Sequence, residues 1–333
     1  MIVLLFISES DIKQAITMAE TMDALEGAFK VHSQGKTVTP LRTHLELEEI
    51  NGIGLFMPSW IGPHKNLGIK ALTLLQDNPS RNLPAIQGTM QLFDGDTGAP
   101  MSLLEASYIT KLRTGASSGV ATRYFAPEGA TKAAIIGTGA QSYTQLWAML
   151  TGAPSIDTVC IFDVFAEKAQ EYKEMVEADF KNVNFQVAQT AAEAVKEAQV
   201  ITTCTTSKEP VFKLEDLNQE KVHVNAVGAF KPEMQETDPQ VVQKADKVVI
   251  DDFEGVMAEA GDLIIPIEKG EFSKEEIYGE IGEVILGEKQ KREDGDKITL
   301  YKTVGMGSLD VAAAQAIYES AKKNNIGKEL SLK

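Results

Sequence analysis

The sequence predicts an α/β protein that combines a doubly wound parallel sheet with an α+β part. Three observations lead to this prediction. Strand-like and helix-like segments alternate from about Gly129 onward, as a parallel sheet with crossover helices requires. Before that point, consecutive strand-like segments are joined by short turns, which is typical of antiparallel pairing. Within the alternating part, one strand leads through a turn with two glycines directly into a helix.

The first part begins with a short apolar strand and a helix. Ser8 or Asp11 can cap this helix, which we expect to reach about Gln34 and to end at Gly35. Strand-like segments follow, and the turn DGDTG between the last two predicts a hairpin. The segments are RTHLEL, GIGLFMP, NLGIKALTLL, IQGTMQLFD and APMSLL. A helix rich in small residues, EASYITKLRTGASSGVATRYFA, is expected to pack closely against a neighbour.

The second part alternates strands with helices. Strand KAAIIG precedes a helix expected at 140–152, TVCIFDV precedes one at 165–179, and NFQV precedes a short helix from Ala191. Further strands are expected at QVITTCT, VHVNAVG, KVVIDD and ITLYKTVG. The last helix, GSLDVAAAQAIYESAKK, has Ser308 or Asp310 as its expected N-cap and can fold back onto the first part. The expected domains are therefore residues 1–127 with 306–333, and residues 128–305.

Charge and composition limit the partners of the chain. The net charge of −16 and the pI of about 4.8 disfavour nucleic acid and anionic membranes as partners. The apolar segments fall short of the roughly 18 residues that span a bilayer, and the start MIVLLFISESD lacks the basic region of a signal peptide. Cys160 and Cys204 have no partners at metal-site spacing. We therefore expect a cytoplasmic protein with reduced thiols and no metal site.

A turn with two glycines joins strand KAAIIG to the helix after it. The first glycine allows a tight turn, and the second lets the backbone approach a pyrophosphate at the helix N-terminus. Ser142 stands where a third glycine is usual, so an ordinary structural turn is the alternative. The residues assigned to cofactor binding are Gly137, Thr138, Gly139, Ala140 and Gln141.

The next strand ends in an acid, Asp163, at the spacing typical of a Rossmann fold. Such an acid accepts the ribose hydroxyls of NAD and repels the 2′-phosphate of NADP. The alternatives are a helix-capping aspartate before FAEKAQEY and a fold of this kind that binds S-adenosylmethionine. Together with the glycine turn and the alternation, Asp163 predicts NAD as the cofactor.

The chain resembles the ornithine cyclodeaminase/mu-crystallin family in the motifs LRTGASS, IIGTGAQ and KTVGMGSLD. The resemblance extends over essentially the whole chain. It implies a Rossmann domain plus an α+β substrate and dimerisation domain, and therefore a homodimer. It also implies hydride exchange between nicotinamide and an amino-acid α-carbon through an imine. The family includes ornithine and lysine cyclodeaminases, alanine dehydrogenases, and ketimine and pyrroline-carboxylate reductases.

The resemblance places three cations around the substrate carboxylate and imine: Arg42, Lys70 and Arg113. Lys70 interrupts an apolar strand, so a buried ammonium at this position needs an anion nearby. The two arginines can each clamp a carboxylate, although from the residues alone each of the three cations could instead face water. We assign Lys70 to general acid/base catalysis or carboxylate orientation, and Thr114, in the same motif as Arg113, to the cofactor.

The stretch VGAFKPEMQE departs from the cyclodeaminase pattern. Cyclodeaminases of the family carry an aspartate where this chain has Phe230, and phenylalanine can neither move protons nor pair with an ammonium. This difference favours the dehydrogenase or imine-reductase branch. The end of strand QVITTCT is expected at the cofactor crevice, with a plain loop as the alternative. The residues assigned there are Thr205, Thr206, Val227 and Gly228.

The sequence therefore predicts an NAD-dependent oxidoreductase that acts on a small amino acid or cyclic imino acid. It would be of the alanine dehydrogenase or pyrroline-2-carboxylate/ketimine reductase type. Two alternatives stay open. The first is an ornithine cyclodeaminase, which converts ornithine to proline plus ammonia and uses NAD catalytically. The second is a mu-crystallin-like protein that binds a small ligand without turnover.

Overall fold

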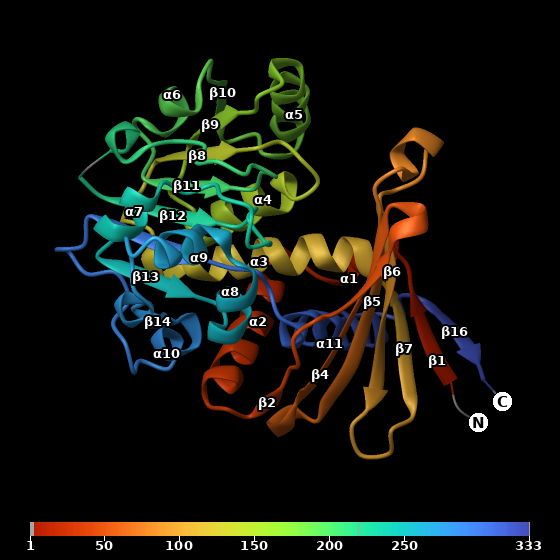
Figure 1. Ribbon diagram of the computed structural model, residues 1–333. Coiled ribbons are helices and arrows are strands. Elements are labelled where there is room, and N and C mark those ends of the chain that lie inside the picture. Colours follow the sequence, from red (N-terminus) through yellow and green to blue (C-terminus); the bar gives the residue numbers. More distant parts are fainter. Residues whose placement is uncertain (1–2, 219, 333) are drawn as a thin grey trace. The chain divides into compact units, whose positions relative to one another are not determined.

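The computed structural model describes residues 3–218 and 220–332 (Figure 1). Contacts between Cα atoms divide the chain into two compact units. The first unit comprises Met1–Arg113 and Met306–Lys333, and the second unit comprises Thr114–Gly305. The division falls inside helix α3 (Ala106–Phe125), and the boundary expected at 127/128 lies just beyond the end of this helix.

A mostly antiparallel sheet of eight strands forms the first unit. Its order is β16-β1-β7-β6-β5-β4-β2, and β3 also pairs with β4. Strands β1 and β7 run parallel, and the other neighbours run antiparallel. The expected hairpin is confirmed, because β6 and β7 pair antiparallel on either side of the DGDTG turn. Within the turn, Asp94 accepts a hydrogen bond from the backbone N–H of Thr97. The strands are β1 (Val3–Ile7), β2 (Thr37–Val38), β3 (Thr43–Leu47), β4 (Gly52–Ile61), β5 (Asn66–Leu75), β6 (Ile86–Asp94), β7 (Pro100–Glu105) and β16 (Lys328–Ser331).

Helices α2 and α11 pack on one face of this sheet, and α1 packs on α11 (Figure 1). The single helix expected to reach Gln34 is wrong, because Ile16 is extended and two helices form instead. Ser8 caps the first of them and Thr17 caps the second, each in a reciprocal pair with an acid three residues later. The helices are α1 (Glu9–Ala15), α2 (Met18–Ser33) and α11 (Gly307–Lys323).

The opposite face of the sheet is apolar and partly exposed. Phe56 of β4 is 38% exposed, and Phe6 of β1 is 37% exposed. Between them, one row of paired residues crosses four neighbouring strands of the sheet. This row consists of Pro58, Ile69, Gln91 and Leu103. A face that is apolar apart from Gln91 is typical of a surface that another protein chain covers.

A parallel sheet of eight strands forms the core of the second unit, which confirms the predicted doubly wound sheet. Its order is β10-β9-β8-β11-β12-β15-β13-β14. The strand order reverses between β8 and β11, and doubly wound sheets bind ligands at the carboxyl ends of strands beside such a point. The strands are β8 (Lys132–Ile136), β9 (Thr158–Phe162), β10 (Asn184–Val187), β11 (Val200–Thr203), β12 (Val222–Ala226), β13 (Lys247–Ile250), β14 (Gly279–Glu280) and β15 (Ile298–Lys302).

Apolar side chains extend from both faces of this sheet into two cores. Ala133 and Ile135 of β8 join one core with α4 and α5, while Ala134 and Ile136 join the other with α6 and α7. Burial on both faces explains why the central strands have unbroken apolar sequences. The helices of the unit are α4 (Ser142–Gly152), α5 (Ala166–Asp179), α6 (Ala191–Val195), α7 (Pro239–Lys244), α8 (Phe253–Glu259), α9 (Gly261–Glu268) and α10 (Ile281–Ile285).

Small residues allow α3 to approach α4 closely, as expected from its sequence. A Cβ atom at Gly115 would lie 2.4 Å from the carbonyl oxygen of Thr144. A Cβ atom at Gly152 would lie 2.6 Å from the carbonyl oxygen of Gly119. Larger side chains at these positions would therefore separate the two helices.

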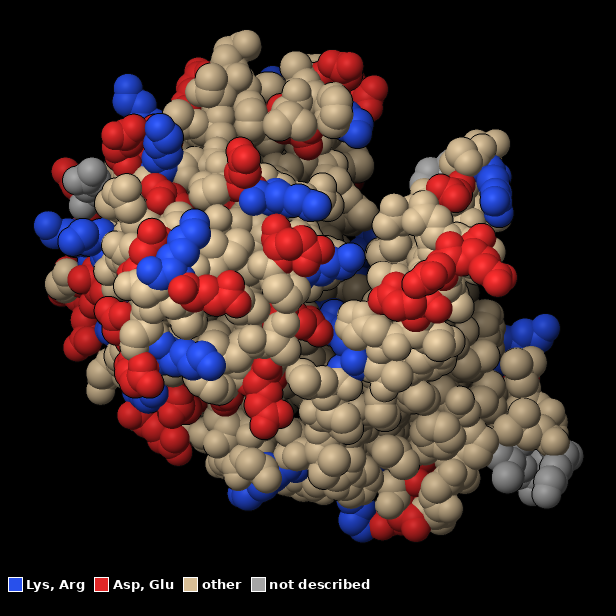
Figure 2. All heavy atoms as spheres, viewed as in Figure 1, with Lys and Arg blue, Asp and Glu red and all other residues tan. Residues whose placement is uncertain are grey.

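Among the described residues, no helix has both the length and the apolar character needed to cross a membrane. Figure 2 shows acidic and basic side chains interspersed on the drawn face of the second unit. The described residues there form no continuous basic surface of the kind that follows a phosphate backbone.

Candidate functional site: a dinucleotide cavity and a buried ionic cluster

A cavity of about 410 Å³ opens at the carboxyl ends of β8, β9 and β11 in the second unit. It lies beside the point where the strand order reverses. Of the predicted cofactor residues, those that line it are Gly137, Gly139, Asp163, Thr205 and Thr206. The fold thus brings together the glycine turn, the strand-end acid and the loop after β11, which are far apart in the sequence.

The two glycines of the turn differ in their surroundings. Gly137 has a φ of 95°, which favours glycine, and a Cβ atom there would lie 2.8 Å from the methyl group of Thr205. Gly139 faces open space, since no atom lies within 4 Å of a Cβ atom built on it. Helix α4 follows with Gln141 as N-cap and no side-chain capping bond. An open glycine before an uncapped helix N-terminus fits a pyrophosphate, so these residues fit a dinucleotide.

Asp163 ties the end of β9 to the glycine turn. Its Oδ2 atom accepts hydrogen bonds from the backbone N–H and the hydroxyl of Thr138, both at 2.8 Å. Its Oδ1 atom accepts one from the backbone N–H of Phe165 at 3.0 Å. Burial alone would raise the pKa of Asp163, but these hydrogen bonds hold the pKa below its usual value. The carboxylate is therefore ionised at neutral pH, where it can discriminate against a phosphate.

Several residues assigned to the cofactor lie outside the described lining of this cavity. Thr138 holds Asp163, as described above. Thr114 is buried in α3, and Val227 donates its backbone N–H to the carbonyl of Thr203 at 3.1 Å. The residues outside the lining are Thr114, Thr138, Ala140, Gln141, Val227 and Gly228. Their contact with the cofactor stays a prediction.

A buried ionic cluster lies in the first unit. It joins Lys70 of β5, Arg113 of α3 and Asp310 of α11, and all three side chains are buried. Lys70 Nζ lies 2.7 Å from Asp310 Oδ2. The Nε–H of Arg113 donates to Asp310 Oδ1 at 2.9 Å. Gly307 allows α11 to begin close to β4, where a Cβ atom would lie 3.3 Å from the carbonyl oxygen of Pro58.

Burial and neighbouring charges set the protonation of this cluster. Burial, together with the charges of Arg113 and Arg42, lowers the pKa of Lys70 to about 7, although the charge of Asp310 opposes this shift. Although burial alone would raise it, the Arg113 and Lys70 cations hold the pKa of Asp310 below its usual value. Arg42, which lies just before β3 rather than in a strand, is thus near enough to act on Lys70.

The ammonium of Lys70 keeps donor capacity for a ligand. Its 2.7 Å contact with Asp310 Oδ2 can use only one of its three N–H groups. Among the described residues, no other acceptor satisfies Lys70 Nζ. A fully buried ammonium with unused donors is costly unless a ligand completes its hydrogen bonds.

The sequence reasoning assigned Asp310 a different role, as a helix cap. The N-cap of α11 is Met306, without a side-chain hydrogen bond, and the predicted caps Ser308 and Asp310 are instead buried in the first turn. One signal was available, since Lys70 in an apolar strand requires an anion, and an acid in the motif KTVGMGSLD was a candidate. A second missed residue, Glu236, is also fully buried and lies in the second unit.

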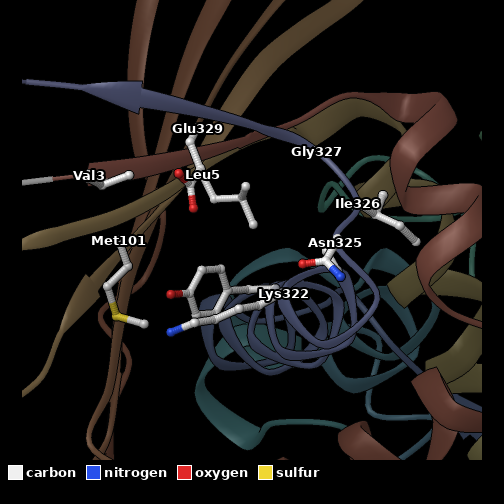
Figure 3. Close-up of a pocket in the computed structure, with 10 residues that line it drawn as sticks. Val3, Leu5, Met101, Lys322, Asn325, Ile326, Gly327 and Glu329 are labelled. Carbon is white, nitrogen blue, oxygen red and sulfur yellow. The ribbon is translucent and has the colours of Figure 1, made fainter.

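The first unit contains a further cavity of about 330 Å³ between β1, β16 and the end of α11 (Figure 3). Lys322 and Glu329 extend into it from α11 and β16, and Leu5 and Met101 bound its apolar side. Its lining includes none of the ionic cluster residues. This cavity is therefore separate from the candidate site.

The fold and these sites define a class: a dinucleotide-binding α/β protein with an α+β unit that holds a buried cluster of cations around one acid. The family model described as the ornithine cyclodeaminase/mu-crystallin family matches residues 3–325. The chain belongs to this family.

Named relatives are similar over nearly the full length of the chain. A Δ1-pyrroline-2-carboxylate reductase of Bacillus cereus is 36% identical over 98% of this chain and 99% of its own. The Thermococcus litoralis Δ1-pyrroline-2-carboxylate reductase, solved with NADH and L-proline, is 36% identical over 98% of this chain and 99% of its own, with a TM-score of 0.91. An archaeal alanine dehydrogenase dimer with bound NAD is 33% identical over 99% of this chain and 100% of its own, also with a TM-score of 0.91.

Proposed function

We propose that this protein uses NADH to reduce a small cyclic imino acid of the Δ1-pyrroline-2-carboxylate type to the corresponding amino acid. At the coarser level it is an NAD-dependent oxidoreductase of imino and amino acids, as its relatives are. The observation that carries the specific proposal is the fully buried Lys70, whose ammonium contacts Asp310 and keeps unused donors. The similarity to two pyrroline-2-carboxylate reductases supports this choice of substrate over an open-chain one.

The first unit is proposed to hold the substrate. Lys70 and Arg113 share the single carboxylate of Asp310, so these three groups retain a positive charge when Lys70 is protonated. The carboxylate of an imino acid neutralises that charge and accepts hydrogen bonds from the unused N–H groups of Lys70. Burial strengthens both interactions, because little water competes inside the cluster.

The second unit is proposed to hold the cofactor. Gly137 and Gly139 would receive the pyrophosphate, and the ionised Asp163 would receive the adenosine ribose. When bound, NADH supplies a hydride to the imine carbon. The residues of the turn contribute position and charge rather than covalent chemistry.

Lys70 is proposed to supply the proton that the substrate nitrogen needs. A lysine with an ordinary pKa would hold its proton too tightly at neutral pH, whereas a pKa of about 7 suits proton transfer. Asp310 orients the ammonium and helps to keep part of the population protonated, because its charge opposes the effect of burial. Arg113 would anchor the carboxylate while the proton moves.

The test is a panel of substrates in which the absorbance of NADH at 340 nm is monitored during turnover. Cyclic imino acids, pyruvate with ammonia, and ornithine with NAD are compared at equal concentrations. The proposal expects the highest kcat/KM for a five- or six-membered cyclic imino acid with NADH. Conversion of ornithine to proline without a net absorbance change would instead identify a cyclodeaminase, against the presence of Phe230. Tight binding without turnover would identify a binding protein.

We also propose that the protein forms a homodimer through the open face of the sheet in the first unit, which is the face opposite α2 and α11. This face presents the row around Ile69 and Leu103, with Phe56 partly exposed beside it. Apolar surface of this kind is normally covered. The dimeric state of the archaeal alanine dehydrogenase, which has the same fold, supports this proposal.

A further inference from the structure

Glu236 is a buried acid in the second unit that the proposed reaction does not use. It is 0% exposed, and its backbone N–H donates to Asp262 Oδ1 at 2.7 Å. Asp262 is itself paired with Lys302 at 2.8 Å. The carbonyl oxygen of Glu236 accepts a hydrogen bond from the backbone N–H of Val211 at 2.8 Å. The position of Glu236 is therefore fixed from both sides by the backbone.

The side chain of Glu236 joins the loops after two neighbouring parallel strands. Its Oε1 atom accepts from the backbone N–H of Thr205, beyond β11, at 2.5 Å. Its Oε2 atom accepts from the backbone N–H groups of Gly228 and Ala229, beyond β12, at 2.6 and 3.1 Å. The hydroxyl of Thr203 donates to Oε2 at 3.1 Å. Four donors around one carboxylate are a strong, geometrically specific set.

The Glu236 carboxylate is next to the dinucleotide cavity, because one of its hydrogen-bond donors, Thr205, lines that cavity. Thr205 lines the cavity, and a Cβ atom at Gly228 would lie 2.2 Å from the carbonyl oxygen of Thr205. The two loops are thus packed without spare room. Neither loop is in a helix or strand, so without the Glu236 carboxylate these backbone N–H groups would lose the acceptors that the structure gives them.

We infer that Glu236 is a positioning residue that holds the loops after β11 and β12 in the shape required to bind NADH. The inference rests on the proposed function, because it assigns the cavity to that cofactor. Glu236 does not contact the reacting atoms in this account. Its effect reaches the cofactor through Thr205 and Gly228.

The decisive variant is Glu236→Gln. The amide preserves size but replaces one acceptor oxygen by an NH₂ group, so at least one backbone N–H then faces a donor in either orientation. We expect the Kd and the KM for NADH to rise about tenfold or more, while kcat at saturating NADH and the KM for the imino acid change little. A merely structural role would lower the fraction of folded enzyme without changing the Kd or the KM for NADH.

Two further variants complete the test. Asp246→Asn is the matched control. Asp246 Oδ2 accepts hydrogen bonds from the backbone N–H groups of Lys297 and Ile298, where β13 and β15 begin, whereas the cavity lies at the carboxyl ends of strands of the same sheet. Its affinity for NADH should equal that of the wild type. If Glu236→Gln does not fold, Glu236→Asp, which keeps the carboxyl group on a shorter stem, should show the same selective rise in the KM for NADH.

The measurement is the Kd for NADH of each purified protein, determined from the change in NADH fluorescence on binding. A wild type that does not bind NADH would overturn the proposed function and this inference together. A wild type that binds NADH, with a folded Glu236→Gln or Glu236→Asp variant of unchanged affinity, would overturn only the inference.

Discussion

At the scale of single residues, the protonation of Lys70 sets the pH range of the proposed reaction. Burial lowers the pKa of Lys70 to about 7, so the ammonium is present below that pH and is lost above it. Because Lys70 is proposed to donate a proton, kcat/KM for imine reduction should fall about tenfold per pH unit above 7. A rate profile over a neutral to alkaline range measures this fall.

Replacing Lys70 separates turnover from cofactor binding. Lys70→Met keeps most of the buried stem but removes the proton donor, so turnover should drop by about 10³-fold while NADH affinity is unchanged. Lys70→Arg keeps a charge that does not titrate near neutrality, so its remaining activity should lack the fall above pH 7. Lys65→Met, at an exposed lysine, is the control. Full activity in Lys70→Met would contradict the assignment.

Gly139 offers a test of the pyrophosphate site that does not disturb folding. No atom lies within 4 Å of a Cβ atom there, so Gly139→Ala should leave the melting temperature of the free protein nearly unchanged. The added methyl group would occupy the space assigned to the pyrophosphate, and the Kd for NADH should rise at least about tenfold. Calorimetry with and without NADH measures both quantities. Equal affinity in the two proteins would place the cofactor elsewhere.

Asp163 is expected to set the choice between NADH and NADPH. The ionised carboxylate repels a 2′-phosphate, so Asp163→Ser should reduce the preference for NADH about tenfold or more. Because Asp163 also binds Thr138, a moderate loss of NADH affinity should accompany the change. The ratio of the two kcat/KM values is the readout. An unchanged ratio would remove Asp163 from cofactor selection.

The sequence identified residues whose chemistry conflicts with their surroundings, and it missed their partners. The family resemblance indicated Lys70, with its place in an apolar strand as support, and the spacing after the glycine turn indicated Asp163. Asp310 and Glu236 lie in segments where an acid has an ordinary local explanation, as a helix cap or a loop residue. Their roles come from tertiary contacts with residues distant in the sequence.

At the scale of elements, glycines control how closely α3 packs against α4. Gly115→Ala would place a methyl group 2.4 Å from a backbone oxygen, which should destabilise the protein by about 1–3 kcal/mol. Gly27→Ala is the matched control, because Gly27 also lies inside a helix but has no atom within 4 Å of the added carbon. That variant should stabilise the protein by about 0.5–1 kcal/mol. Denaturant unfolding distinguishes the two, and equal stabilities would contradict the packing argument.

Most strands and the helices α4 and α5 form where expected, whereas the break between α1 and α2 was not predicted. The apolar runs of both sheets stand out in the sequence and form strands where expected. The break at Ile16 was missed although Thr17 and Glu20 have the spacing of a capping box, because the residues around Ile16 also suit a continuous helix. The short strand β16 pairs with β1, and this long-range pairing is what makes its polar sequence a strand.

At the scale of the whole molecule, the open sheet face leads to a test of the homodimer. Phe56→Glu adds a charge to that face, so a particle of twice the 36.2 kDa chain mass should become a monomer. Met175→Glu adds the same charge at an exposed position of α5 in the second unit and should leave the dimer intact. Light scattering after size-exclusion chromatography measures the mass. A wild-type monomer would contradict the proposal.

The central claim is that the protein moves hydrogen from NADH to the α-carbon of a cyclic imino acid. The direct measurement uses NADH that carries deuterium at both C4 positions, incubated with Δ1-pyrroline-2-carboxylate and the enzyme. Mass spectrometry should find one deuterium per molecule of proline, bonded to the α-carbon, with one equivalent of NAD formed. Proline without deuterium, or no proline at all, would contradict the account.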